Sequence, residues 1–264
     1  MEDTEKKPTL DPALSRQLHG ALTANKEELY LVLQSASMEV LRAALRNQAL
    51  DEDHLLALLK RRDLSEDLLK AIYKLPLTAE SHNLKLALVK NPNTPGTIIT
   101  TLLPHLYLFE LVTLCYLPGV TPDQKLAAER AIIQRIPTTP LGNKLTLARR
   151  GTTPVLEALL KEGEPQIVEI CLANPHIKEA AIFQFLGSAK ATADNISIIA
   201  RHPRWKTRPN IIGAILKNPR TPLIWFDLFL PGLHPAELKK LLVSGRLDTP
   251  RKNAVQEALR RRGH

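Results

Sequence analysis

The sequence predicts an all-α protein, and within that class an α-solenoid of degenerate helix-pair repeats. Hydrophobic residues make up 44 % of the chain but aromatic residues only 4 %, so its apolar content is mostly Leu, Ile and Ala. Leu and Ala favour helices, whereas strands favour aromatic and β-branched residues. Apolar positions also recur at spacings of three and four, as in residues 41–59, 155–160 and 180–186, and this is helical periodicity.

The predicted helices are short. Most apolar segments run for roughly 8 to 14 residues, which is too short for a helix to be stable alone in water. Such helices gain stability by packing on neighbours, and repeated packing of this kind is how a solenoid buries its core. The segments therefore favour stacked helix pairs over a few long helices.

Six Thr-Pro dipeptides mark expected helix starts. A Thr hydroxyl is a good N-cap, and proline suits the first helical position, where its missing N–H has no partner to lose. We therefore expect Thr94 and Thr221 to be N-caps, with Pro95 and Pro222 in the first turn. The six dipeptides are Thr94-Pro95, Thr121-Pro122, Thr139-Pro140, Thr153-Pro154, Thr221-Pro222 and Thr249-Pro250.

Three Asn-Pro dipeptides mark expected helix ends. Asn tolerates the left-handed conformation after a helix, and a following proline prevents the helix from continuing. Residues 90–95 and 217–222 then read as a stop, a tight turn and a start. The three dipeptides are Asn91-Pro92, Asn174-Pro175 and Asn218-Pro219, and His202-Pro203 has the same pattern.

Part of the chain is duplicated. Residues 84–114 and 211–241 are identical at 12 of 31 positions with an offset of 127, and a one-residue shift then matches Thr121-Pro122 to Thr249-Pro250. Intervals of 44 residues also link Asn47 to Asn91 and Asn174 to Asn218. Since three such intervals come close to the larger offset, we expect about 40–45 residues per unit, the range of HEAT and armadillo repeats.

The corner motif carries a family resemblance. A small apolar helix, then Asn-Pro-x-Thr-Pro, then a second apolar helix resembles the leucine-rich repeat variant proteins and, more broadly, HEAT-like bacterial α-solenoids. The best matches are LALVKNPNTPGTIITTLL and GAILKNPRTPLIWFDLFL. The resemblance covers about residues 36–260 and implies architecture only. Some proteins of this kind carry an N-terminal cysteine cluster for an iron–sulfur centre, but this N-terminus has no cysteine, so no cofactor is carried over.

Charge is unevenly distributed along the chain. Residues 201–264 hold 14 Lys and Arg against 4 Asp and Glu, whereas residues 1–200 hold 22 against 23. We expect a partly disordered or capping segment over residues 1–25 and one helical repeat domain over residues 26–264, basic from 201 onward. No apolar run approaches the ~18 residues that cross a bilayer, and no signal peptide is evident, so we expect a cytoplasmic protein.

No catalytic or metal-binding constellation emerges from the sequence. It contains no P-loop, GxGxxG, HExxH, CxxC or GxSxG motif. Asp51-Glu52-Asp53-His54 is interpreted as an N-cap with acidic first-turn residues, with a metal site as the alternative. Cys115 and Cys171 lie in apolar runs and are interpreted as buried small hydrophobes. We therefore expect no enzyme, no cofactor and no metal.

The best candidate for binding is the basic segment around Trp205. Basic side chains interleaved with aromatics can hold phosphates and stack bases, and Trp and Arg are also enriched at protein–protein hot spots. A third interpretation is a solvated loop in which Trp205 joins two helices. The candidate partner-binding residues are Arg201, Arg204, Trp205, Lys206, Arg208, Arg220, Trp225 and Arg246.

Two functions remain open at this point. The first is a non-enzymatic scaffold or adaptor that binds another protein on its repeat faces. The second is a nucleic-acid-binding protein that uses the basic C-terminal quarter, in which case binding should weaken steeply with salt. An enzyme has no motif behind it, and Asp227 is the only acidic residue close to Trp225 in the sequence. The sequence predicts no membrane association and shows no small-molecule site.

Overall fold

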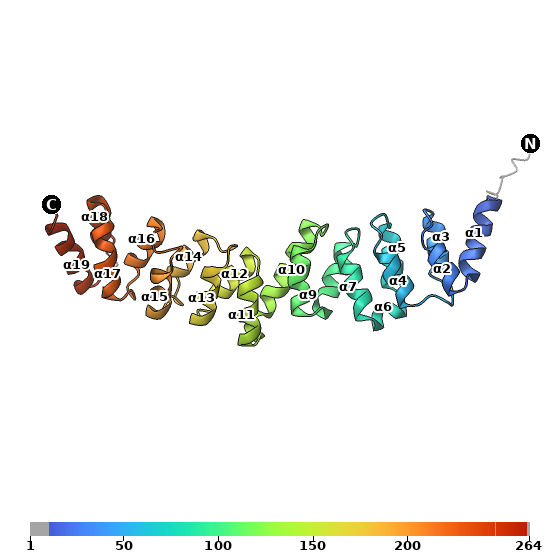
Figure 1. The fold of residues 1–264 in the computed structure, drawn as a ribbon, viewed down its shortest axis with the longest axis horizontal. Coiled ribbons are helices and arrows are strands. Elements are labelled where there is room, and N and C mark those ends of the chain that lie inside the picture. Colours follow the sequence, from blue (N-terminus) through green and yellow to red (C-terminus); the bar gives the residue numbers. More distant parts are fainter. Residues whose placement is uncertain (1–10, 246, 263–264) are drawn as a thin grey trace, which may run out of the picture. The chain divides into compact units, whose positions relative to one another are not determined.

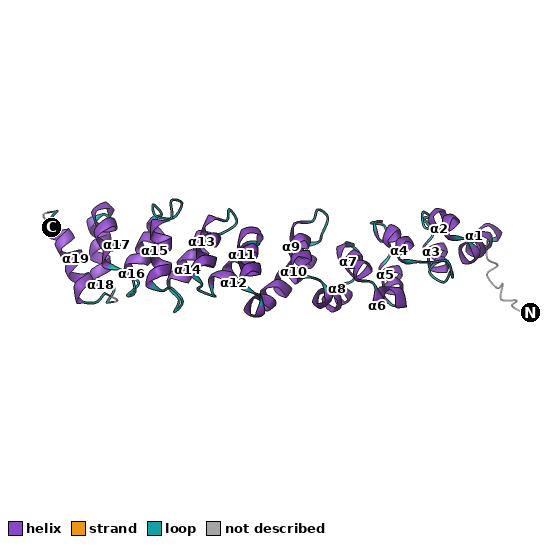
Figure 2. Cartoon of the chain, turned by 60° about the horizontal axis from the view of Figure 1, so that its bottom comes forward, coloured by secondary structure: helices purple, strands orange, loops and turns teal. Residues whose placement is uncertain are grey.

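The structure, a computed structural model, describes residues 11–245 and 247–262 of the chain. All regular structure in that part is helical, with no strand, so the all-α prediction is confirmed (Figure 2). The chain divides into two compact units, Met1–Ala131 and Ile132–His264. Within each unit the helices follow one another in chain order (Figure 1).

The described part of the first unit, from residue 11 onward, contains nine α-helices and a 3-10 turn, followed by α10, the helix in which the division between the units falls. They are α1 (Pro12–Thr23), α2 (Lys26–Val32), α3 (Met38–Ala44), α4 (Glu52–Leu59), α5 (Glu66–Tyr73), α6 (Pro76–Glu80), α7 (His82–Lys90), α8 (Gly96–Leu102), η1 (Leu103–His105), α9 (Leu108–Tyr116) and then α10 (Pro122–Arg135).

The described part of the second unit repeats this order. Its elements are η2 (Ile136–Thr138), α11 (Leu141–Arg150), α12 (Thr153–Leu160), α13 (Pro165–Ala173), α14 (Glu179–Leu186), α15 (Ala193–Arg201), α16 (Pro209–Lys217), α17 (Leu223–Phe229), η3 (Leu230–Gly232), α18 (Pro235–Val243) and α19 (Thr249–Arg260).

Helices pack both on the next helix of the chain and on the next helix but one. In the first unit α1 contacts α3 and α3 contacts α5, while α2 contacts α4, and α4 contacts α7 because the short α6 adds one helix between them. In the second unit α11, α13 and α15 form one such series, and α12, α14 and α16 form the other. The buried apolar residues are almost entirely Leu, Ile, Val and Ala. Each short helix thus obtains its stability from packing, as the apolar periodicity predicted.

The two units are duplicates of one another over most of their length. Most helices of the first unit have a counterpart in the second unit that begins 127 residues later, which is the offset of the duplicated segments. These helices are α2 to α5 and α7 to α10, and η1 has its counterpart η3 at the same offset. The N-caps agree without any shift: Thr121 Oγ1 accepts from the Gln124 amide at 3.2 Å, and Asp248 caps α19. The expected one-residue shift between Thr121-Pro122 and Thr249-Pro250 is therefore wrong, because Asp248 and not Thr249 takes the capping position.

Corresponding helices follow one another at shorter intervals than expected. In the first unit α2, α4, α7 and α9 begin at Lys26, Glu52, His82 and Leu108, and in the second α12, α14, α16 and α18 begin at Thr153, Glu179, Pro209 and Pro235. The three successive intervals are the same in both units, and every one of them is well short of the expected repeat length. The 44-residue interval is not the repeat length, because it joins residues of different helix series. Asn47 follows α3, which packs on α1 and α5, whereas Asn91 follows α7, which packs on α4.

Buried asparagines tie successive helices together. Asn91 Nδ2 donates to the carbonyls of Leu59 and Arg61 at 3.0 and 2.8 Å, and Asn91 Oδ1 accepts from the Asn93 amide at 3.1 Å. Its counterpart Asn218 donates to Leu186 O at 2.7 Å. These carbonyls lie at the ends of preceding helices, where no intrahelical donor reaches them. One side chain therefore closes its own turn and caps the neighbouring helix.

Asn47 and Asn174 form a second equivalent pair. Both donate to the carbonyl of an equivalent alanine, Ala21 or Ala148, at 2.9 Å. Asn91, Asn174 and Asn218 are all C-caps, so the predicted helix ends are confirmed. Their backbone, however, is extended, with φ between −69° and −83°, and not left-handed as expected. The side chain, not a left-handed turn, completes these helix ends.

Thr94 and Thr221 are not N-caps, contrary to our prediction. Thr94 Oγ1 donates backward to Leu88 O at 2.6 Å, and Thr221 Oγ1 donates to Ile215 O at 2.5 Å. Pro95 and Pro222 themselves take the N-cap position, without a side-chain hydrogen bond. The turn after Asn-Pro is so tight that each buried hydroxyl lies closer to the end of the preceding helix than to the amides of the next one.

Candidate interaction surfaces

The predicted basic segment is the place where the second unit departs from the first. Residues 203–207 form the turn between α15 and α16, whereas the equivalent residues of the first unit form the short helix α6. Pro76 and Pro203 match, and so do the basic Lys74 and Arg201, but Leu77, Ala79 and Ser81 are replaced by basic residues, which gives the second unit four basic residues here. These are Arg201, Arg204, Lys206 and Arg208.

Trp205 is part of the core. Its side chain is only 2 % exposed, and its indole Nε1 donates to Leu172 O at 3.0 Å. In the first unit Thr78 occupies the equivalent position and donates to Ile72 O. Of the interpretations given above, the one in which Trp205 joins two helices describes its contacts, and its face is not open for stacking.

Arg204 holds the same corner in place. Its guanidinium lies 4.4 Å from the Trp205 ring centroid, a cation–π arrangement. It also donates to Asn174 O at 3.0 Å and to Ile177 O at 3.4 Å, both in the turn after α13. Arg204 and Trp205 together attach the turn after α15 to the preceding helix of its series.

The remaining predicted residues fall into two groups, those held by hydrogen bonds or ring stacking and those that are exposed. Arg220 donates to Ala189 O, and the Trp225 indole donates to Ser197 Oγ at 2.9 Å while its ring stacks on Phe229. Arg246 lies outside the described residues. Within the described part of the chain, the predicted side chains that are exposed and have no hydrogen-bonding partner are Arg201, Lys206 and Arg208.

A groove of about 490 Å³ runs beside this corner, and we call it the corner groove. Three basic side chains line it, Lys178, Arg204 and Arg208, against one acidic residue, Glu179. The positions that match these three in the first unit hold Asp51, Leu77 and Ser81. Its basic character is therefore confined to the second unit. The other residues lining the corner groove are Thr153, Pro175, His176, Ile177 and Trp205.

His202 adds a titratable group close to the corner groove. It is the C-cap of α15, and its Nδ1 accepts from the Arg204 amide at 3.3 Å. Burial and the neighbouring Arg204 charge lower the pKa of His202 below its usual 6.5, because both oppose a positive imidazolium. The ring is thus mostly neutral at pH 7, and the local positive charge there comes from Lys and Arg.

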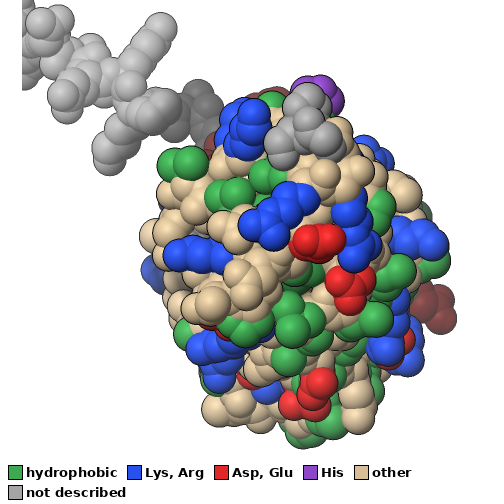
Figure 3. Space-filling model, turned by 90° about the vertical axis from the view of Figure 1, so that its left-hand side faces the viewer, with side chains coloured by type: hydrophobic (Ala, Val, Ile, Leu, Met, Phe, Trp, Pro, Cys, Tyr) green, Lys and Arg blue, Asp and Glu red, His purple; other side chains and the backbone are tan. Residues whose placement is uncertain are grey.

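The C-terminal helix carries further basic residues, but they do not form one patch. Arg251 donates to Thr221 O at 2.7 Å, and Arg262 donates to Leu230 O at 3.0 Å. Lys252 and Arg260 are exposed. Lys and Arg side chains are spread over this end of the second unit with hydrophobic and acidic side chains between them (Figure 3).

A larger groove lies in the first unit, and we call it the lysine groove. Its volume is about 780 Å³, and it crosses α4 and α7. The two helices supply closely similar motifs, LALLK over residues 56–60 and LALVK over residues 86–90. The groove was not predicted, because apolar residues at helical spacing indicate only that one face of each helix is buried. The repeated lysine at the end of each segment was the available signal.

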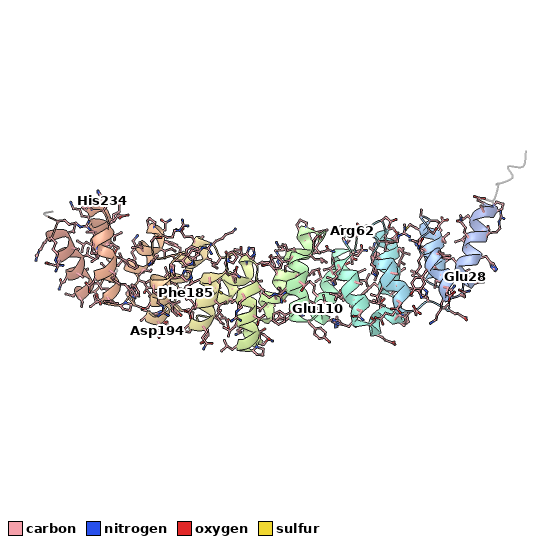
Figure 4. The ribbon with its side chains drawn as sticks, in the orientation of Figure 1. Glu28, Arg62, Glu110, Phe185, Asp194 and His234 are labelled. Atoms are coloured by element: carbon pink, nitrogen blue, oxygen red, sulfur yellow. The ribbon has the colours of Figure 1, made fainter. Side chains whose placement is uncertain are left out.

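The side chains of this repeated motif lie on two sides of each helix. Leu58, Leu59, Leu88 and Val89 are buried in the core. Leu56, Ala57, Leu86 and Ala87 are half-buried and line the lysine groove. Lys60 is exposed and Lys90 half-buried, and each stands at the end of its helix. Arg62, labelled at the upper side in Figure 4, also lines the groove. The other lining residues are Tyr30, Asp53, Leu59, Arg61, Asn83, Asn91, Pro92, Leu117 and Pro118.

The acidic cluster and both cysteines have structural roles. Asp51 caps α4 and is bonded to the buried His54 at 2.5 Å, as the N-cap interpretation predicted. Cys115 and Cys171 are buried and free, and burial raises the pKa of their thiols to about 11 and about 12. Neither is a thiolate at neutral pH. In the described residues, no three His, Cys, Asp or Glu side chains gather where they could hold a metal ion.

Comparisons with known proteins give no relatives. No protein-family model matches the chain, and no curated protein or solved structure matches it either. None of the described helices is both long and apolar enough to cross a membrane.

Proposed function

We propose that this chain is a non-enzymatic protein-interaction scaffold, an α-solenoid of helix pairs, whose corner groove docks an acidic segment of a partner protein. The solenoid is supported by packing on the next helix but one and by the matching sequence of helix starts in the two units. A chain of stacked pairs presents long surfaces on which partners can dock.

One difference between the units supports the corner groove as the binding surface. The two units share helix starts and buried asparagines, but at the corner groove Lys178 and Arg208 stand where the first unit has Asp51 and Ser81. Neither cation has a hydrogen-bonding partner among the described residues. Unpaired cations in a groove attract carboxylates by their summed field.

A protein partner is favoured over nucleic acid by the aromatic residues. Non-specific single-strand binding combines a basic groove with aromatic faces on which bases stack. Trp205 is buried, and the Trp225 ring is half-buried against Phe229. The basic segment therefore presents cations without an open stacking platform, which suits carboxylates on a peptide.

The test compares two labelled probes by fluorescence anisotropy: a twelve-residue peptide of alternating Glu and Ser, and a twelve-nucleotide oligothymidylate. The double variant Lys178→Glu, Arg208→Glu removes two groove cations but leaves Arg204 to hold the turn. The control variant Lys252→Glu, Arg260→Glu makes the same charge change on the exposed face of α19. Circular dichroism checks that both variants are folded.

We expect the peptide to bind the wild-type chain and the control variant, and to bind the groove variant at least tenfold more weakly. Equal weakening in both variants would mean that only net charge matters and would contradict the proposal. Tighter binding of the oligothymidylate, with an affinity that falls steeply between 50 and 200 mM salt, would support the nucleic-acid alternative instead.

A further inference from the structure

The second unit has a smaller groove of about 250 Å³ at overlapping positions, lined by Glu157 and Gln184 in place of Tyr30 and Ala57 and by two cations of its own, Lys161 and Lys190. The positions that match Lys60, Arg62 and Tyr30 hold Gly187, Ala189 and Glu157, so two cations and an aromatic ring are absent there. Lys217 alone matches Lys90. The cations of the lysine groove therefore stand at positions that, apart from that of Lys90, are not basic in the second unit, and the lysine groove is separate from the corner groove.

Lys60 and Lys90 are presented by neighbouring helices. Each stands at the C-terminal end of its helix, α4 or α7, and these two helices pack directly on one another. The axes of packed helices lie about 8–10 Å apart, so the two lysines project from helix ends separated by about that distance. Neither has a carboxylate partner among the described residues.

The negative ends of both helices would ordinarily weaken an anion site at this edge. Here the carbonyls of Leu59 and Arg61 at the end of α4 accept from Asn91 Nδ2, and Gln124 Nε2 donates to Val89 O at the end of α7. The neighbouring Arg61 is paired with Asp63 and donates to Leu33 O. The exposed charge at this edge is thus that of Lys60, Lys90 and Arg62.

We propose that the lysine groove binds an amphipathic helix of a partner protein that carries acidic residues seven positions apart. Residues i and i+7 of an α-helix lie on one face about 10.5 Å apart, which is close to the separation of the two packed helices that present the lysines. Apolar side chains at i+3 and i+4 then face the half-buried Leu56, Leu86 and Ala87. This is helix-in-groove recognition with charge complementarity at one edge.

The apolar surface argues for a protein segment at this site. Half-buried leucine and alanine side chains gain from contact with other apolar groups but offer nothing to a phosphate backbone. Among the described residues that line the groove, Tyr30 is the only aromatic one. The proposal extends the scaffold function to a second surface. It is tested independently of the corner groove, because its variants lie in the other unit.

The test uses fluorescein-labelled 14-residue peptides on an alanine and glutamine background. The first peptide has Glu at positions 4 and 11 with Leu at 7 and 8; a second has Lys in place of both Glu; a third has Ala in place of both Leu. Affinities are measured by anisotropy on the full chain up to 1 mM protein. We expect the first peptide to bind at least tenfold more tightly than either of the others.

The protein variants are Lys60→Glu, Lys90→Glu together and, because a reversed charge at a helix end destabilises it, also Lys60→Gln, Lys90→Gln. Lys217→Glu is the matched control, because Lys217 ends α16 as Lys90 ends α7. We expect both double variants to lose at least tenfold in affinity for the first peptide, the control to bind unchanged, and the reversed-charge variant to prefer the Lys peptide.

Several results would overturn the proposal. They are no measurable binding of the first peptide, equal binding of the Glu and Lys peptides by the wild-type chain, and equal loss in the Lys217→Glu control. Displacement of the first peptide by oligothymidylate at lower concentration than by unlabelled peptide would instead assign the site to nucleic acid. The corner-groove variant Lys178→Glu, Arg208→Glu should leave this binding intact, even if the corner groove itself proves to bind nothing.

Discussion

Replacing Asn91 by Ala should destabilise the first unit strongly although it removes only an amide group. The side chain is 2 % exposed and makes three hydrogen bonds, two to the carbonyls of Leu59 and Arg61 and one from the Asn93 amide. At about 0.5–1.5 kcal/mol each, their loss lowers the free energy of unfolding by about 1.5–4.5 kcal/mol. Asn218, with one carbonyl and one amide bond, should contribute about 1–3 kcal/mol on the same basis.

The measurement is urea unfolding followed by circular dichroism, with Asn83→Ala as the control. Asn83 is an exposed asparagine of the same helix, with one hydrogen bond to Glu52 at 3.1 Å, so its loss should change stability by less than about 0.5 kcal/mol. We expect the order Asn91→Ala, then Asn218→Ala, then Asn83→Ala. If Asn91→Ala is no more destabilising than the control, the asparagine is not what joins successive helices.

Single contacts give three further predictions. Thr94→Ala should lower the free energy of unfolding by about 0.5–1.5 kcal/mol, because it removes the hydroxyl that donates to Leu88 O. Thr94→Ser keeps this hydroxyl and should keep most of the stability. Equal destabilisation of the two variants in urea unfolding would contradict this role. Trp205→Phe should lower the free energy of unfolding by about 1–3 kcal/mol, and with it the thermal midpoint, since it leaves Leu172 O without its donor; an unchanged midpoint would refute that role. The pKa of His202 is lowered in the folded chain, so the unfolded chain binds more protons, and stability is full above pH 6.5 and falls as pH drops through the folded pKa. His202→Asn should flatten the dependence of the urea midpoint on pH below 6.5, and an unaltered slope would exclude His202 as its source.

Local patterns in the sequence were sufficient to predict the helical class and the helix ends. Asn91 and Asn218 end their helices because a proline follows each, and that rule involves adjacent residues only. The role of Thr94 was not predictable in the same way. Whether a hydroxyl faces forward to a free amide or backward to a free carbonyl depends on the path of the whole turn, and both outcomes satisfy one backbone group.

The repeat length was mispredicted because equivalent-looking residues occur in both helix series. Asn47 and Asn91 have the same kind of contact, a side-chain amide on the carbonyls of a preceding helix, but in different series. Sequence spacing alone cannot assign a residue to a series, since that assignment is made by packing. For the same reason the burial of Trp205, which depends on its contact with Leu172 in α13, could not be inferred from the basic residues around it.

Comparing the two duplicated units distinguishes the residues that the fold requires from those that only alter the surface. Where the two units must solve the same packing problem, they use the same residue: Asn47 and Asn174 donate to equivalent alanines, and Thr94 and Thr221 donate to equivalent carbonyls. These pairs are explained by the fold alone.

Positions that differ between the units on the same backbone show where the fold does not require one residue. Asp51 caps α4, but Lys178 at the matching N-cap makes no capping hydrogen bond. The change from Asp51 to Lys178 at the corner groove alters charge without altering the helix start that follows it, and the change from Lys60 to Gly187 at the lysine groove does the same at a helix end. A scaffold with two identical surfaces would bind two copies of one partner segment. The cations of the corner groove and of the lysine groove stand at positions that are mostly not basic in the other unit. If both grooves bind as proposed, they would take different segments, and simultaneous binding would hold two partner segments on one chain.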